Sequence, residues 1–234
     1  MNDFGVTETR WYDRLGVFDL ETTGIDTDTS RIVSAYVGVI DVNGAPKGVS
    51  WLADPGIEIP AQATAVHGIS TERARVEGRD AAEVVAEIVA VLRSLLAQNV
   101  PIVIYNAPYD LTLLDRECRR YAIEPLAGPR PIIDPLVIDR AMDRYRSGKR
   151  TLEAAAVHYG VELIDAHNAE AYAVAAGRVA QAVARKYFDT LGNDLGQVHD
   201  NQITWAAESA VSFQAYMRRV KDPEFVADGA WPQR

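Results

Sequence analysis

The strongest constraint on the fold is a change of hydrophobic pattern about one third of the way along the chain. Residues 15–21 read as a strand that alternates beyond Phe18, and residues 31–41 are rich in β-branched and aromatic side chains. Asn43-Gly44 is a typical hairpin turn, and residues 49–52 follow it as a third strand. The first third of the chain is therefore predicted to form an antiparallel meander of three strands.

The rest of the chain alternates helices with short apolar strands. A helix is predicted after Asp80, which forms a capping-box pattern with Glu83, and apolar residues then recur at helical spacing as far as Leu96. Residues 101–105 are almost entirely apolar, as expected for a strand covered on both faces. The other predicted elements are a strand near 131–134 and helices at about 108–121, 135–145, 151–158, 168–191 and 202–219.

This order of elements indicates an α/β fold. We expect a mixed sheet, in which the antiparallel three-strand meander is followed by parallel strands, with helices on both faces. The expected organisation is a loose leader over residues 1–13, one domain over 14–191, and a C-terminal helix and tail over 192–234. The tail region is too short to be a second domain.

Composition limits the partners of such a protein. The chain has 33 acidic and 24 basic residues and a net charge of −9, so a broad basic face that wraps duplex DNA is not expected. Contact with a polyanion should be local or made through a metal ion. The single cysteine, Cys118, excludes an internal disulfide and a multi-cysteine zinc site. The polar first ten residues and the lack of an apolar run of roughly 18 residues predict a cytoplasmic protein without a membrane partner.

Two carboxylates lie at the end of the first predicted strand. Asp19 and Glu21 are two residues apart and project from the same face, while Leu20 points into the core. Like charges this close repel each other unless a cation lies between them, and carboxylate oxygens suit Mg²⁺ or Mn²⁺. A solvated strand end is the simpler alternative. Thr22-Thr23-Gly24 favours the metal hypothesis, because it places the acids where a strand ends and a tight turn opens a cleft.

A second polar cluster follows the apolar strand at 101–105. Asn106 is a candidate N-cap, Pro108 suits a first helical turn, and Asp110 would lie near the positive end of the helix dipole. These roles alone would explain the residues structurally. The functional alternative is that Asp110 faces Asp19 across the ends of neighbouring strands, where clefts of α/β sheets form.

The motifs resemble those of a known superfamily. Residues Phe18 to Gly24 (FDLETTG) resemble the first motif of the four-carboxylate (DEDD) 3′–5′ exonucleases, and Asn106 to Asp110 (NAPYD) resemble the second. Residues Asp165 to Ala169 (DAHNA) resemble the third motif of the histidine-bearing branch, which includes the proofreading subunit of bacterial replicative polymerase. Three ordered motifs are more specific than any one of them.

The resemblance implies a ribonuclease-H-like fold and metal-assisted removal of nucleotides from a 3′ end. In the family two Mg²⁺ or Mn²⁺ ions are used, and here Asp19, Glu21 and Asp110 would be their ligands. His167 would be the general base, because an imidazole with a pKa near 6.5 can take a proton at neutral pH.

One position departs from the family pattern. A fourth carboxylate should follow the histidine by five residues, but Tyr172 stands there. A phenol with a pKa near 10 is a neutral and poor ligand for Mg²⁺ at pH 7. Glu170 lies about 200° away around a helix and should not substitute. We therefore expect impaired activity, with metal binding reduced to one ion or to weakly held ions.

Further residues are expected to contact the substrate, which would be a DNA 3′ end or a nucleotide. By resemblance, His67 and Ile69 would line the pocket for the terminal nucleotide, although Ile69 could instead fill the core. Tyr109 could stack on a sugar or base, or pack in the core. The other expected contacts are with Thr22, Thr23, Gly24 and Asn106.

Three functions remain open at this point. The leading one is a 3′–5′ exonuclease acting on single-stranded or frayed DNA in proofreading or repair. The alternatives are a catalytically degenerate module that binds nucleic acid or a DNA polymerase, and a 3′–5′ exoribonuclease. Residues 139–150 carry a local charge of +3, so Arg144, Arg146, Lys149 and Arg150 could guide a nucleic-acid backbone, with a solvated loop as the alternative.

Overall fold

A six-stranded sheet forms the centre of the protein, as described by a computed structural model over residues 9–163 and 168–234. The strand order is β4-β3-β2-β1-β5-β6. Strands β1 (Arg14–Thr22), β2 (Ile32–Asp41) and β3 (Lys47–Asp54) form the predicted antiparallel meander. The hairpin turn between β2 and β3 includes a hydrogen bond from the Gly44 N–H to the Asp41 carbonyl.

The remaining strands are short and parallel to their neighbours. Strand β5 (Ile102–Val103) pairs with β1, and β6 (Ile132–Ile133) pairs with β5. Strand β4 (Arg79–Asp80), which was not predicted, pairs with β3. Because β1, β5 and β6 run in the same direction, their carboxyl ends lie along one edge of the sheet, where clefts of α/β proteins form.

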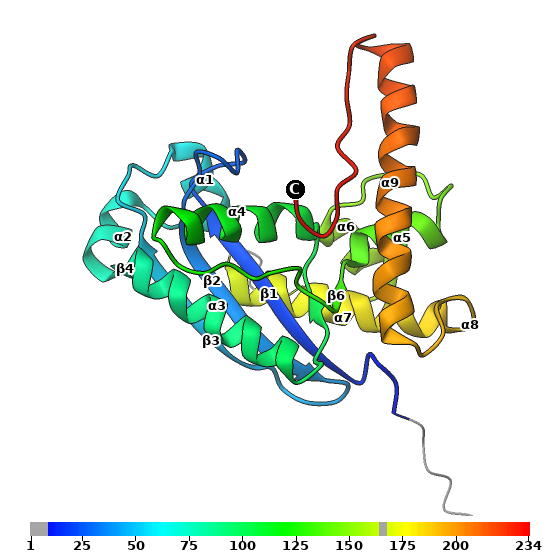
Figure 1. Cartoon of the computed structure of the whole chain (residues 1–234), viewed down its shortest axis with the longest axis horizontal. Helices are drawn as coiled ribbons and strands as arrows, with labels where there is room; N and C mark the ends of the chain where they lie inside the picture. The colour runs from blue at the N-terminus through cyan, green and yellow to red at the C-terminus, as the bar shows by residue number, and fades with distance from the viewer. Residues whose placement is uncertain (1–8, 164–167) are drawn as a thin grey trace, which may run out of the picture.

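Helices cover both faces of the sheet, as predicted (Figure 1). Helices α3 (Ala81–Ala97) and α4 (Ala107–Arg120) pack on the face to which Phe18 and Leu20 point. Helices α6 (Leu152–Tyr159) and α7 (Ala169–Lys186) belong to the opposite face with Val17. Gly177 lets α7 lie close to the sheet, because a Cβ there would come within 2.5 Å of both Val17 Cγ1 and Ile40 Cδ1.

Two of the helices begin at clear capping residues. Ser70 caps α2 (Thr71–Glu77) by accepting a hydrogen bond from the Arg73 N–H, and Asp80 caps α3 through the Glu83 N–H, the latter as predicted. The other helices are α1 (Ala61–His67), α5 (Pro135–Met142), α8 (Phe188–Leu191) and α9 (Leu195–Val220).

Two predicted helices have different bounds. The helix expected over 168–191 is interrupted at Tyr187, which separates α7 from the one-turn helix α8. The helix expected to begin at 202 begins at Leu195, because Asp194 caps it by accepting from the Gln197 N–H at 3.0 Å. His199 is consequently part of α9 and buried, and its Nδ1 accepts a hydrogen bond from the Ile132 N–H.

The segments that flank the sheet are also packed. Residues 9–13 are not a loose leader, because Trp11 is buried and its Nε1–H donates to the Gly192 carbonyl at 3.1 Å. The tail after α9 folds back along that helix toward the sheet (Figure 1), and Phe225 forms an edge-to-face ring contact with Phe213. Within the described residues, none of the helices has both the length and the apolar character needed to cross a membrane.

Candidate functional site

Asp19 and Glu21 lie at the carboxyl end of β1, on the side covered by α7. Leu20, between them, points to the opposite face and belongs to the core under α3 and α4. The regular pairing of β1 with β2 is disturbed between Glu21 and Thr22, where the chain leaves the sheet. Glu21 is only 7% exposed, whereas Asp19 keeps partial contact with solvent.

Asp110 joins these two acids from the first turn of α4. Its Oδ1 accepts a hydrogen bond from the Leu20 N–H at 3.2 Å, and this bond ties the start of α4 to the backbone between Asp19 and Glu21. Asp110 is buried. The structure therefore brings Asp110 close to Asp19 and Glu21, which lie about ninety residues earlier in the sequence.

Burial raises the pKa of each of these carboxyl groups, and repulsion by neighbouring carboxylates adds to the effect for Asp19 and Asp110. Burial is the main cause for Asp19, and the charges of Asp110 and Glu21 add to it. Burial also raises the pKa of Asp110, against the opposing effect of its backbone hydrogen bonds. Burial alone raises the pKa of Glu21 to about 7. We call Asp19, Glu21 and Asp110 the carboxylate cluster.

The donor chemistry of the carboxylate cluster suits a divalent cation. Glu21 Oε1 is buried and has no hydrogen-bond partner among the described residues, so this oxygen is available to coordinate a cation. A hard cation would offset the repulsion that raises these pKa values. No three His, Cys, Asp or Glu side chains within residues 9–163 and 168–234 are gathered closely enough to hold an ion, so a bound ion would have to draw the cluster together.

Asn106 was predicted to cap α4, but its side chain does not do so. Its backbone is left-handed, with φ 66°, and its side chain makes no capping hydrogen bond. Instead the buried carboxylate of Asp134, at the end of β6, accepts hydrogen bonds from the N–H groups of Asn106 (3.0 Å) and Ala107 (2.9 Å). It also accepts from the Leu136 N–H at 3.0 Å and thereby caps α5.

Asp134 is the residue near the site that sequence reasoning missed. The available signal was local: an acid directly after an apolar strand and before Pro135, which is a favourable pair at the start of a helix. That pattern predicts a cap for α5. It does not predict that the same carboxylate would reach the start of α4, because the pairing of β5 with β6 decides this.

The turn after β1 is held by α4. Tyr109 Oη donates to the Gly24 carbonyl at 2.5 Å and lies 2.6 Å from Thr22 Oγ1. Thr23 is buried, and its Oγ1 accepts a hydrogen bond from the Arg31 N–H at 3.0 Å. These side chains of the predicted substrate-binding set therefore have structural bonds, and they fix the turn beside the carboxylate cluster.

His67 and Ile69 lie behind this turn. His67 is buried, its Nδ1 accepts from the Ile69 N–H at 3.1 Å, and burial lowers the pKa of its ring despite the opposing effect of the nearby Thr22 backbone. Ile69 is buried in a small apolar cluster with Val33 and Ile59. The core alternative for Ile69 thus describes its position in the structure.

Tyr172 extends from the first turn of α7 toward the carboxylate cluster. Its Oη donates to Glu153 Oε1 at 3.2 Å. Burial, with smaller contributions from the bond to Glu153 and the charges of Glu153, Glu21 and Asp19, raises the pKa of its phenol to about 12. The phenol is therefore neutral at pH 7. Glu170 is exposed, and Asp165 and His167 lie outside the described residues.

The basic segment 139–150 is partly engaged in structural ion pairs. Arg146 and Arg150 both bind the fully buried carboxylate of Asp139, and the Arg150 Nη1–Asp139 Oδ2 distance is 2.7 Å. These two arginines therefore have a structural role, and their guidance of a nucleic-acid backbone stays a prediction. Arg144 and Lys149 are exposed.

Comparison with known proteins gives a consistent set of similarities. A model of the Exonuclease family (RNase_T) matches residues 17–178, a span that includes the carboxylate cluster and Tyr172. A DNA polymerase III subunit epsilon-like protein of Rhodobacter capsulatus is 32% identical over 128 residues, which are 52% of this chain and 16% of that protein. This chain thus corresponds to a small part of that relative.

Solved structures show the same fold. E. coli exonuclease I in complex with a dA16 oligonucleotide matches with a TM-score of 0.66 and 21% identity, over 76% of this chain and 43% of that one. A zinc-bound E. coli exonuclease I–ssDNA complex matches with a TM-score of 0.64 and 22% identity, over 76% and 42%. The predicted ribonuclease-H-like sheet is confirmed by this likeness.

Proposed function

Because the chain belongs to the Exonuclease family, we propose that it is a metal-dependent 3′–5′ exonuclease of single-stranded or frayed DNA ends whose activity is lowered by Tyr172. The predicted family is confirmed by the match over residues 17–178. The observation that carries the proposal is the carboxylate cluster, in which Glu21 keeps a buried oxygen without a partner.

Asp19, Glu21 and Asp110 would hold one or two Mg²⁺ or Mn²⁺ ions. When bound, such ions supply a nucleophilic hydroxide and neutralise charge on the scissile phosphate. Asp19 is placed to meet both ion and substrate, because it is the cluster member that keeps contact with solvent. The Leu20 N–H bond holds the Asp110 carboxylate beside the backbone between Asp19 and Glu21.

His167 would take the proton from the attacking water. This role follows from the family resemblance, and its chemical basis is an imidazole pKa close to neutral pH. Asn168, the next residue, caps α7 by accepting from the Ala171 N–H at 2.8 Å, so the helix that carries Tyr172 starts directly after His167.

Tyr172 is the reason to expect reduced activity. At pH 7 its neutral phenol brings no negative charge to the cluster, whereas a carboxylate there would add a ligand. A second candidate function rests on the same residue: a module that binds nucleic acid or a DNA polymerase without efficient cleavage. The epsilon-like relative supports a polymerase partner, and the exonuclease I–ssDNA complexes support a single-stranded DNA ligand.

The test is a nuclease assay on oligonucleotides labelled at the 5′ end, with Mg²⁺, Mn²⁺ or EDTA. Shortening from the 3′ end that requires the metal and is abolished by Asp19→Asn supports the proposal. Binding without shortening supports the module instead. Parallel DNA and RNA oligomers separate the DNA exonuclease from the exoribonuclease, since the 2′-hydroxyl decides that preference.

A further inference from the structure

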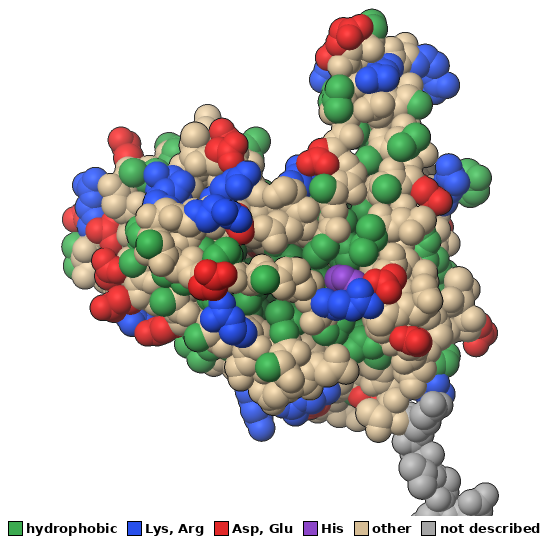
Figure 2. Space-filling model, viewed as in Figure 1, with side chains coloured by type: hydrophobic (Ala, Val, Ile, Leu, Met, Phe, Trp, Pro, Cys, Tyr) green, Lys and Arg blue, Asp and Glu red, His purple; other side chains and the backbone are tan. Residues whose placement is uncertain are grey.

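Two adjoining cavities lie between α5, α9 and the tail. One has a volume of about 600 Å³ and the other about 470 Å³. Both are lined by Arg140, Trp205, Ser209 and Phe213, so they form one continuous groove along α9. Figure 2 shows the molecule hollowed between the body and the raised arm of α9 with its tail, with hydrophobic side chains along the foot of α9.

The inner end of the groove lies at the start of α4, the helix that carries Asp110. Its first cavity reaches Asn106, Pro108 and Asp134, where β5 and β6 end. Asp110 lies in the same first turn of α4 as Pro108. The carboxyl ends of β1, β5 and β6 are neighbours in the sheet, so a strand whose end reaches Asp19 can continue past Asn106 into the groove.

The outer cavity of the groove has unpaired positive charge. Arg140 and Arg144 are exposed, and neither forms an ion pair with another described residue. Glu208 also lies on this wall. Arg146 and Arg150, which are paired with Asp139, line the same cavity.

The opposite wall presents aromatic side chains. Trp205 is partly buried at the foot of α9, and Phe213 is 50% exposed. Their positions on α9 are about 12 Å apart along the helix axis, from the rise of 1.5 Å per residue. A basic wall facing aromatic rings is the usual surface for single-stranded nucleic acid, since phosphates pair with arginine and bases stack on the rings.

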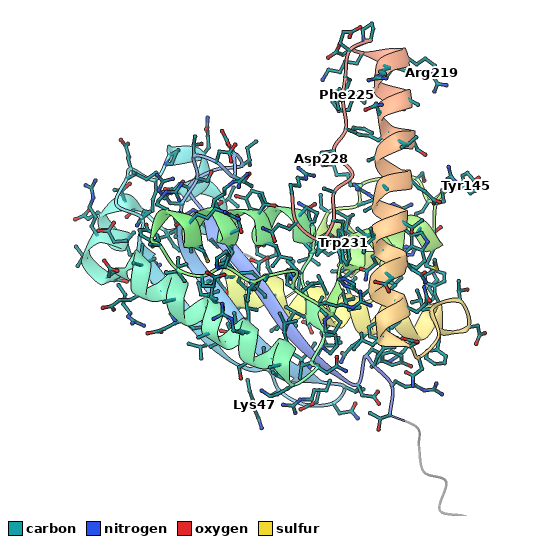
Figure 3. All side chains as sticks on the ribbon, viewed as in Figure 1. Lys47, Tyr145, Arg219, Phe225, Asp228 and Trp231 are labelled. Carbon is teal, nitrogen blue, oxygen red and sulfur yellow. The ribbon has the colours of Figure 1, made fainter. Side chains whose placement is uncertain are left out.

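The tail forms one wall of the inner cavity of the groove. Trp231 is buried where the tail meets the body (Figure 3), and its Nε1–H donates to Asp134 Oδ2 at 3.3 Å. Asp228 lines this cavity and pairs with Arg234 at 3.6 Å, so its negative charge is offset within the tail. These two contacts hold the tail in position along the inner cavity.

We propose that this groove binds the single-stranded stretch of DNA that lies on the 5′ side of the terminal nucleotide. Arg140 and Arg144 contact phosphates, and Phe213 with Trp205 stacks on bases. The proposal rests on the proposed function, which it extends by assigning the path of the strand. Helix α9 lies outside the span that matches the Exonuclease family, so the match does not assign this surface.

The test compares oligonucleotide length. Fluorescence anisotropy in EDTA, where cleavage does not occur, measures the affinity of the full chain for labelled dT12 and dT4. We expect Arg140→Ala/Arg144→Ala to weaken dT12 binding about tenfold or more and to leave dT4 within about twofold. The salt dependence of dT12 binding should fall by about 1.4 in slope, from two lost phosphate contacts.

Lys47→Ala/Arg75→Ala is the matched control. It removes the same charge from exposed side chains on β3 and α2, and Lys47 lies at the far end of the sheet from the arm of α9 (Figure 3). Phe213→Ala tests stacking without a change of charge, and circular dichroism checks that each variant is folded. Equal losses for dT12 and dT4, or losses equal to the control, overturn the groove.

The outcome for the groove is distinguishable from that for the proposed function. A parent chain that binds dT12 through Arg140 and Arg144 but cleaves nothing retains the groove and loses the nuclease. A parent that cleaves dT12 with unchanged KM in the double variant retains the nuclease and loses the groove. Parent binding to neither oligonucleotide overturns the groove, and a protein segment is then the alternative occupant.

Discussion

The phenol of Tyr172 donates a hydrogen bond to Glu153 Oε1 at 3.2 Å, and this bond joins the first turns of α7 and α6 beside the carboxylate cluster. The hydroxyl of Tyr172 therefore has a specific partner on a neighbouring helix. Glu153 is exposed and has its pKa lowered despite partial burial, in part through this bond, so it remains ionised at neutral pH.

Replacing Tyr172 with Asp should raise nuclease activity. The substitution supplies a carboxylate at the position where the resemblance places a fourth metal ligand, and we expect a gain of about 10–100-fold in Mn²⁺-dependent cleavage. Tyr172→Phe is the control, because it removes the bond to Glu153 without adding an acid. Single-turnover cleavage and Mn²⁺ titration measure the effect, and equal rates for parent and Tyr172→Asp would contradict the proposed role.

Asp19→Asn should abolish cleavage while stabilising the metal-free protein. The amide has nearly the same shape but removes one charge from a cluster whose members repel each other and are desolvated. The expected result is a higher Tm in EDTA together with a loss of activity of at least 100-fold in Mn²⁺. Asp189→Asn on α8 is exposed and should change neither quantity. A lower Tm for Asp19→Asn would indicate that its carboxylate is already compensated.

Stability without metal should fall as the pH rises from about 4.5 to 7. Burial raises the pKa of Glu21 to about 7, so between these values the folded state binds more protons than the unfolded state. The same sign holds for Asp19 and Asp110, whose pKa values are also raised. Urea unfolding in EDTA at several pH values measures this slope.

Glu21→Gln should make that slope smaller but not remove it, because Asp19 and Asp110 still titrate. Saturating Mg²⁺ or Mn²⁺ should reverse the loss of stability near pH 7, since the metal binds the ionised cluster. A slope that is identical for the parent and Glu21→Gln would show that the Glu21 carboxylate is accessible to water in the folded protein.

Asp134→Ala should be the most destabilising of these changes. It leaves the buried N–H groups of Ala107 and Leu136, and the partly buried N–H of Asn106, without their acceptor, and we expect a loss of about 2–4 kcal/mol. Asp80→Ala, which removes an exposed cap of α3, should cost about 1 kcal/mol. Chemical denaturation compares the two, and similar losses would mean that Asp134 acts as an ordinary helix cap.

Much of the fold was predictable because its signals are local. The alternation in β1, the turn at Asn43-Gly44 and the caps at Ser70 and Asp80 each depend on a few consecutive residues. The start of α9 was predicted seven residues too late, because its first turns mix polar and apolar residues. The packing of His199 against Ile132, which buries this histidine, is a long-range contact. Strand β4 is two residues long and is fixed only by its pairing with β3.

The candidate site was predictable in its members but not in its support. The spacing of Asp19 and Glu21 follows from the geometry of a strand, and Asp110 was placed in the first turn of its helix. Two supporting interactions depend on which strands are neighbours. They are the bond from the Leu20 N–H to Asp110 and the three backbone hydrogen bonds that Asp134 accepts. Long-range pairing of this kind leaves no trace in the local sequence.

The tail is anchored near the start of α4 by two bonds. Trp231 donates to Asp134, the carboxylate that also binds the N–H groups of Asn106 and Ala107, and the Arg234 N–H donates to Thr112 Oγ1 on α4 itself at 2.9 Å. Asp110 lies two residues before Thr112 on this helix. A shortened version that ends before Gly229, convenient for expression or crystallisation, would lose both bonds and weaken the support of the turn that carries Asp110. Recombinant versions of this protein should therefore keep residues 229–234.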